Sequence, residues 1–189
     1  MTWVVVALLA LGLSWPGVGV AATLVLTERQ QQEAIQAGER SITAEAFGAE
    51  WRVAGATGEM ATVMTPFHRL AIAARHAAFN GKPLKPGEPA KILKENRDRL
   101  VFWINLRGPS EEFARYYVPR LLVGDREIKA SFVQNERTAM RQNDGAYLAR
   151  CVYGFPTKEI KGRERVALVI GNGDGRDVSR FTIDLAQMR

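Results

Sequence analysis

The sequence predicts a mainly β protein, α+β by content, built as an antiparallel β-sandwich with an amphipathic helix packed on a sheet. Three observations support this. Short apolar segments recur after residue 99 and are separated by turns rich in Gly, Asn and Asp. The closing segment, residues 178–185, alternates apolar and polar side chains, as a strand with one buried face does. One well-defined helix, at about residues 65–80, precedes these strands, and one or two further short helices are expected.

The helix at residues 65–80 has clear start and stop signals. Thr65 can accept a hydrogen bond from an unpaired amide of the first turn, and Pro66 suits the first helical position. Gly81 can take the left-handed geometry that ends a helix. Apolar side chains recur at spacings of three and four and form one face, which we expect to cover the sheet around residues 100–106: Phe67, Leu70, Ala71, Ala74 and Ala78.

Two weaker helices are expected on either side of it. Thr27 and Gln30 have the spacing of a capping box, which predicts a surface helix that runs to about Ala37, with Gly38 beyond its end. Residues 89–99 follow a loop rich in Pro and form a short charged helix.

Short apolar runs identify the candidate strands. The strongest, residues 100–106, is apolar on both faces and is expected to be central and covered on both sides. Pro119 predicts an edge strand or a bulge within residues 113–123. The other candidates are residues 50–54, 60–64, 127–134, 146–155, 165–170 and 178–185.

The N-terminal segment has the composition of a signal peptide. Residues 4–13 are all apolar or Gly, and small residues lead up to Ala22, where cleavage is expected. The run is shorter than a transmembrane helix normally requires, and no later apolar stretch approaches membrane-spanning length, so no transmembrane segment is expected in the mature chain. We therefore expect residues 1–22 to be a signal peptide. The remaining single domain, residues 23–189, has a helix-containing part at 23–99 and a β-rich part at 100–189, and is periplasmic or secreted.

Charge and cysteine content limit the partners. The net charge is +6, and the excess lies after residue 81, where 21 basic side chains stand against 14 acidic ones. Outside the cytoplasm this favours a protein or an anionic envelope component over nucleic acid, although an Arg-rich composition can also reflect the genome. Cys151 is the only cysteine, which excludes an intramolecular disulfide and is typical of a buried strand residue. The sequence does not predict the oligomeric state.

The two histidines invite a metal interpretation that helical geometry does not support. His68 and His76 are eight residues apart, which is about 12 Å along a helix, too far for one ion. No metal, cofactor or catalytic residue is predicted, and the Gly-rich segment at residues 171–176 is interpreted as a hairpin turn. We expect the polar side of the helix to accept an anion through four residues: His68, Arg69, Arg75 and His76.

The chain resembles small exported immunoglobulin-like sandwiches of bacterial envelopes. The resemblance lies in the regular succession of predicted hairpins and in the closing turn and strand, NGDGRDVSRFTIDL. The leading hypothesis is an exported, basic, non-catalytic binding or interaction domain that contacts an anionic envelope component or a protein. One alternative is a hydrolase of an envelope polymer that acts through His68 or His76. Another is a structural subunit that assembles through unpaired sheet edges.

Overall fold

A computed structural model describes residue 22 and residues 24–189. These residues are mainly β, with two antiparallel sheets and three α-helices, and are α+β by content. Within the described residues, no helix is long and apolar enough to cross a membrane. The predicted signal peptide lies, apart from Ala22, outside the described residues.

The larger sheet has six strands. Its order is β1-β2-β3-β8-β6, and β7 also pairs with β8. The long central pair β3–β8 runs in register from Arg99 opposite Pro156 to Gly108 opposite Tyr147. The bounds are β1 Arg52–Ala54, β2 Met60–Met64, β3 Arg99–Gly108, β6 Phe132–Gln134, β7 Met140–Arg141 and β8 Tyr147–Pro156.

The smaller sheet has four strands in the order β10-β9-β4-β5. The Gly-rich segment is indeed a hairpin turn, since it joins β9 to β10. The two sheets share one core, in which Phe102 and Phe155 of the larger sheet and Leu121 and Phe181 of the smaller sheet are all buried. The bounds are β4 Val118–Val123, β5 Arg126–Lys129, β9 Arg165–Gly171 and β10 Asp177–Asp184.

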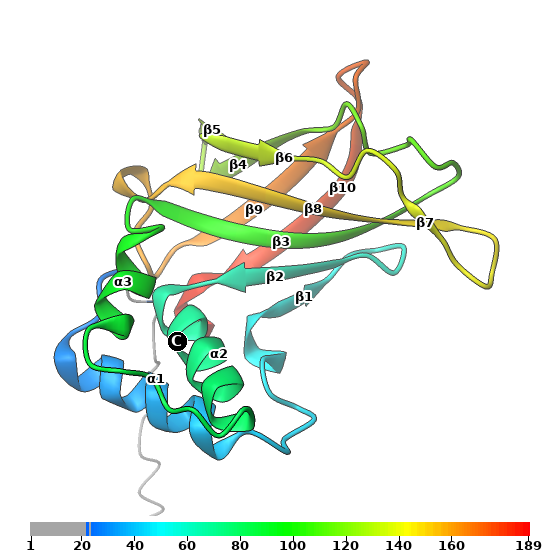
Figure 1. Cartoon of the computed structure of the whole chain (residues 1–189). Helices are drawn as coiled ribbons and strands as arrows, with labels where there is room; N and C mark the ends of the chain where they lie inside the picture. The colour runs from blue at the N-terminus through cyan, green and yellow to red at the C-terminus, as the bar shows by residue number, and fades with distance from the viewer. Residues whose placement is uncertain (1–21, 23) are drawn as a thin grey trace, which may run out of the picture.

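The helices gather beneath the sheets, at the end where β2 and β10 stop (Figure 1). They are α1 Glu28–Arg40, α2 Pro66–Phe79 and α3 Glu88–Lys94. Three short 3₁₀ helices, Ala49–Trp51, Thr157–Glu159 and Leu185–Gln187, complete the regular structure of the described residues.

The expected end of the first helix is wrong. Helix α1 continues through Gly38 to Arg40, because Gly38 lies where α1 crosses α2. A Cβ on Gly38 would stand 2.1 Å from the carbonyl oxygen of Ala71 and 2.9 Å from the Cβ of Ala74. The small residues of α2 therefore pack mainly against α1, and not on the sheet around β3 as the sequence led us to expect.

Two strand predictions also need correction. The expected strand at residues 127–134 is two strands, because the chain leaves the smaller sheet after Lys129 and joins the larger sheet at Phe132. Residues 113–116 form turns and Tyr117 has no regular structure, so β4 begins only at Val118. Strand β4 is not an edge strand. Pro119 lies opposite Ile170 of β9, but β5 pairs with β4 only from Arg120 onwards, so β4 has one open side at Pro119, where a proline is tolerated.

Candidate functional site

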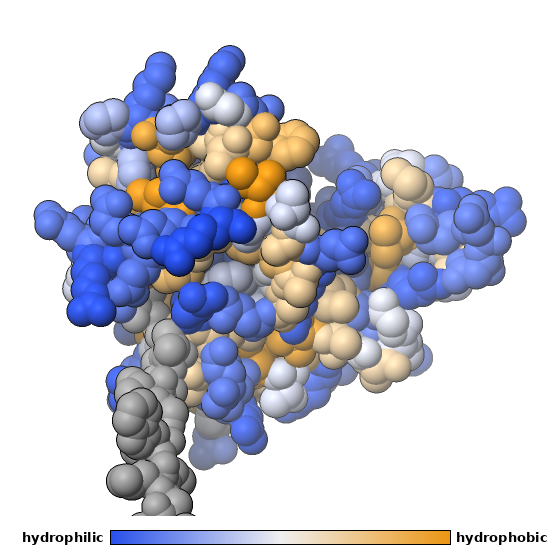
Figure 2. All heavy atoms as spheres, turned by 90° about the horizontal axis from the view of Figure 1, so that it is seen from below, coloured by the Kyte–Doolittle hydropathy of each residue, from blue (hydrophilic) through white to orange (hydrophobic). Residues whose placement is uncertain are grey.

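Helix α2 separates two hollows, and the four residues predicted to bind an anion are divided between them. His68, Arg75 and His76 face a groove between α2 and the outer face of the larger sheet. Arg69 faces a pocket on the other side of α2, toward α3. They do not form one cluster, because Arg69 points away from its neighbour His68 around the helix. Figure 2 views this helical end and shows apolar side chains lying among many polar ones.

The Arg69 pocket has a volume of about 320 Å³. Its apolar wall comes from the N-terminal segment, β2 and α3, with Leu24, Leu26, Met64 and Leu93 among its residues. Its polar rim comes from α2, α3 and the turn that leads into β3. Four basic side chains line it, and no Asp or Glu does: Arg69, Lys94, Arg97 and Arg99.

Arg69 is the unusual member of this rim. Its side chain is half-buried, and burial lowers the pKa of its guanidinium from the ordinary value, against a smaller opposing effect of Glu95. A guanidinium nevertheless stays charged in a protein. Among the described residues its side chain has no hydrogen-bond or ion-pair partner within bonding distance. A charge taken partly out of water is normally paired, whereas the only carboxylate that acts on Arg69, that of Glu95, lies outside ion-pair distance. The pocket therefore offers a positive charge with which a ligand can pair.

We call the second hollow the Trp103 groove; its volume is about 470 Å³. Its apolar surface includes Trp103, which is 50% exposed, and Phe79, which is 73% exposed. Its polar groups are Arg52 and Thr62 from the sheet and His68, Arg75 and His76 from α2. As in the Arg69 pocket, no Asp or Glu lines it.

His68 is held in one tautomer. Its Nδ1 lies 3.0 Å from the carbonyl oxygen of Val63 and must donate to it, because a carbonyl oxygen only accepts. Burial lowers the pKa of His68 to about 4, so the ring is neutral at pH 7 and its Nε2 carries a free lone pair. His68 therefore adds an acceptor to the groove and no positive charge.

The other two predicted residues of the groove have different surroundings. Arg75 donates to the carbonyl oxygens of Ile42 (3.2 Å) and Ala44 (3.3 Å), and it lies over the ring of Phe47, so it holds residues 42–47 against α2. His76 is exposed, and its Nε2 lies 3.2 Å from the side-chain nitrogen of Asn80.

The sequence reasoning missed several members of these hollows. Trp103 was expected in the core, yet the polar residue Asn105 on the same face of β3 marks that face as the outer one. Nothing in the sequence marked Arg52 as a site residue, because only the pairing of β1 with β2 brings it beside α2. A short charged helix was expected at residues 89–99, but nothing in the sequence joins Arg97 to Arg69.

No group of three or more His, Cys, Asp or Glu side chains among the described residues could hold a metal ion. Cys151 is buried in β8 and free, and burial raises the pKa of its thiol.

Comparison with known proteins adds little to this description. No protein-family model and no curated protein matches the sequence. Among solved structures, the chain is similar to a protein of unknown function from Burkholderia pseudomallei K96243, with a TM-score of 0.44 and 9% sequence identity over 86% of this chain and 92% of that one.

Proposed function

We propose that this chain is an exported, non-catalytic binding domain of the cell envelope, and that it holds the anionic headgroup end of a lipid in the Arg69 pocket. The observation that carries the proposal is the half-buried guanidinium of Arg69, which has no partner among the described residues. Lys94, Arg97 and Arg99 extend the positive rim, while the apolar wall suits the start of an acyl chain. A phosphate or carboxylate headgroup matches this arrangement, since guanidinium groups bind both strongly.

The export part of the proposal rests on the sequence. The apolar run at residues 4–13 and the small residues before Ala22 are typical of a signal peptide. Cell fractionation and sequencing of the mature N-terminus test it, and an intact Met1 on a cytoplasmic protein would exclude export. The immunoglobulin-like description also belongs to the proposal. It is supported by the hairpins β4–β5 and β9–β10 and by the core that the two sheets share.

The hydrolase alternative has less support. A hydrolase that uses His68 or His76 needs a carboxylate to orient the imidazole or to act beside it. No acidic side chain lines the groove that holds both histidines, and the Nδ1 of His68 is already occupied by Val63. Assembly through the edges of the larger sheet is also poorly supported, because its edge strands β1 and β6 have only three residues each. The longest edge strand of the described residues is β10 of the smaller sheet, with eight residues.

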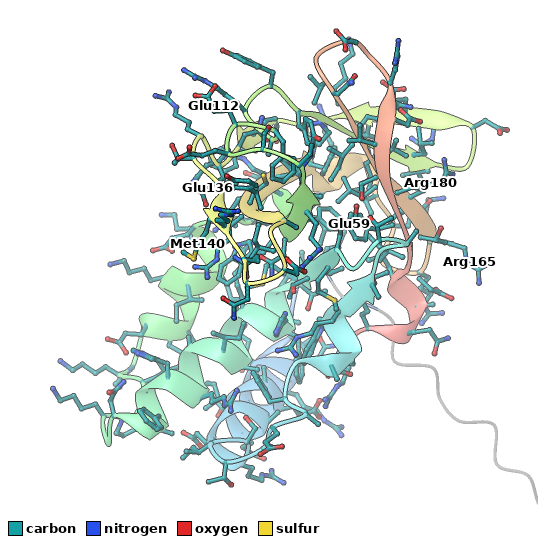
Figure 3. The ribbon with its side chains drawn as sticks, turned by 90° about the vertical axis from the view of Figure 1, so that its right-hand side faces the viewer. Glu59, Glu112, Glu136, Met140, Arg165 and Arg180 are labelled. Carbon is teal, nitrogen blue, oxygen red and sulfur yellow. The ribbon has the colours of Figure 1, made fainter. Side chains whose placement is uncertain are left out.

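The direct test is binding to lipid vesicles. We expect the protein to bind vesicles of phosphatidylglycerol more tightly than vesicles of phosphatidylcholine, and to lose affinity as salt is added. Arg69→Gln should weaken binding about tenfold, because it removes a charge-assisted contact. Arg180→Gln is the matched control, because Arg180 lies on β10 away from the helices (Figure 3) and should leave the affinity unchanged.

Thermal stability separates a binding role from a structural one. Gln at position 69 removes an unpaired, half-buried charge, so the variant should melt at the same temperature as the wild type or higher. Equal affinity for both kinds of vesicle would refute the proposal. So would an Arg69→Gln protein that binds phosphatidylglycerol as well as the wild type does.

A further inference from the structure

A second site lies on the opposite side of α2. His68 is 3% exposed, yet its Nε2 is on the groove side of the ring, because Nδ1 points to the backbone of Val63. Among the described residues Nε2 has no hydrogen-bond partner. This nitrogen is reached from the groove, where it can accept a hydrogen bond. A ligand with an O–H or N–H donor would supply it.

Gly48 leaves the approach to this nitrogen open. The Nε2 of His68 lies 3.5 Å, and a guanidinium nitrogen of Arg52 lies 3.9 Å, from the point that a Cβ on Gly48 would occupy. A ligand that enters beside Gly48 therefore meets a neutral acceptor and a cation within one small region. Gly48 has φ +85°, a conformation that favours Gly and keeps the position free of a side chain.

The walls of the groove are suited to a ring. Trp103 projects from the outer face of β3 with half of its surface exposed, and Phe47 and Phe79 line the groove as well. Exposed aromatic faces stack on flat rings and on the C–H faces of sugars, where they remove apolar surface from water. Arg52 has no ion-pair partner among the described residues, so its charge is available to a ligand.

We propose that the Trp103 groove binds a six-membered ring that carries a hydroxyl group and a carboxylate. The ring stacks on Trp103, the hydroxyl donates to the Nε2 of His68, and the carboxylate pairs with Arg52. Two sources share this chemistry, an acidic sugar of an envelope polysaccharide and an aromatic hydroxy acid. The site is independent of the Arg69 pocket, because no residue lines both hollows.

Four small probes test the groove by calorimetry. D-glucuronate and 4-hydroxybenzoate each carry all three features, whereas D-glucose lacks the charge and benzoate lacks the hydroxyl. We expect one of the first two to bind and its incomplete counterpart to bind about tenfold more weakly. Binding of glucuronate identifies the sugar class, and binding of 4-hydroxybenzoate identifies the aromatic class.

Variants of exposed residues assign the contacts without disturbing the core. Arg52→Gln and Trp103→Ala should each weaken binding about tenfold, while Arg150→Gln, which removes a charge from the same large sheet outside the groove, should not change it. All three variants should still bind phosphatidylglycerol vesicles, so failure at one site is distinguishable from failure at the other.

Nitrogen NMR reports the contact with His68 directly. In ¹⁵N-labelled protein, the Nε2 resonance of His68 should shift when the hydroxylated probe binds, and benzoate should shift it much less. The proposal is overturned if neither complete probe binds. It is also overturned if Nε2 does not respond, or if the Arg52 and Trp103 variants retain full affinity.

Discussion

The imidazole of His68 lies face to face with the indole of Trp51, with ring centroids 4.1 Å apart and planes inclined by 6°. Trp51 is 2% exposed, and its indole nitrogen donates to the carbonyl oxygen of Arg189 over 2.8 Å. The stack therefore connects the segment before β1, the first turn of α2 and the last residue of the chain. It also fixes the ring whose Nε2 faces the Trp103 groove.

Stability should fall in weak acid because of His68. Burial lowers its pKa from 6.5 to about 4, so between these values the unfolded chain binds a proton that the folded chain does not. The free energy of unfolding therefore rises as the pH rises across this window. Lowering the pH through the whole window reduces the free energy of unfolding by roughly 3 kcal/mol. Urea denaturation at about pH 7 and about pH 4.5 measures the loss.

The variant His68→Phe provides the control, since it keeps an aromatic ring beside Trp51 but cannot titrate. Its stability should depend less on pH than that of the wild type. An NMR titration of His68 with a midpoint near 6.5 would contradict the prediction.

Thr65 should stabilise α2 through its hydroxyl group. The hydroxyl accepts from the backbone N–H of His68 over 3.1 Å and donates to the carbonyl oxygen of Arg189 over 2.5 Å. Thr65→Ala removes both bonds and should cost about 1–2 kcal/mol of unfolding free energy. Thr65→Ser should recover most of the loss in urea denaturation, and equal stability of the Ala and Ser variants would argue against the cap.

Gly38→Ala should destabilise the protein although Ala favours helix formation. The added methyl group would overlap the carbonyl oxygen of Ala71 and force α1 away from α2, at a cost of about 1–3 kcal/mol. Glu39→Ala, at an exposed position of the same helix, should change the free energy of unfolding by less than about 0.5 kcal/mol. A more stable Gly38→Ala protein would show that the helices do not meet there.

Arg120 should contribute more through its carbon stem than through its charge. It donates to both carboxylate oxygens of Asp177, at 2.7 and 2.8 Å, but the pair is partly exposed and is expected to give less than about 1 kcal/mol. Directly opposite Arg120 on β9 lies Val169, which is fully buried. Arg120→Ala should therefore cost more than Asp177→Asn, and Arg120→Met should recover most of the difference in chemical denaturation.

Local signals predicted the elements better than their arrangement. The capping residues of α2 and the strand β2 are where the sequence placed them, since the signals of Thr65, Pro66 and a short β-prone segment act over a few residues. Gly38 was misread because a helix-ending Gly and a helix-crossing Gly look the same in sequence. Only the approach of α2 distinguishes them.

The candidate sites depend on long-range contacts, so the sequence could name only part of them. The sequence identified the residues on the polar side of α2. It could not show that Arg69 faces one hollow and His68, Arg75 and His76 face another, because this depends on which elements pack around the helix. The pairing of β1 with β2 brings Arg52 to one hollow, and the packing of α3 brings Arg97 to the other. The neutrality of His68 depends on burial by Trp51, which stands 17 positions earlier in the chain.

The bonds of Arg189 also bear on the order in which the molecule forms. Its carbonyl oxygen accepts a hydrogen bond from the hydroxyl of Thr65, the N-cap of α2, 124 positions earlier. Its guanidinium pairs with the carboxylate of Glu50, 139 positions earlier. Neither contact can exist on a growing chain until everything between has been synthesised. The bonds to Thr65 and Glu50 can therefore form only after Arg189 has been synthesised, so the first turn of α2 and the segment before β1 gain these two contacts late.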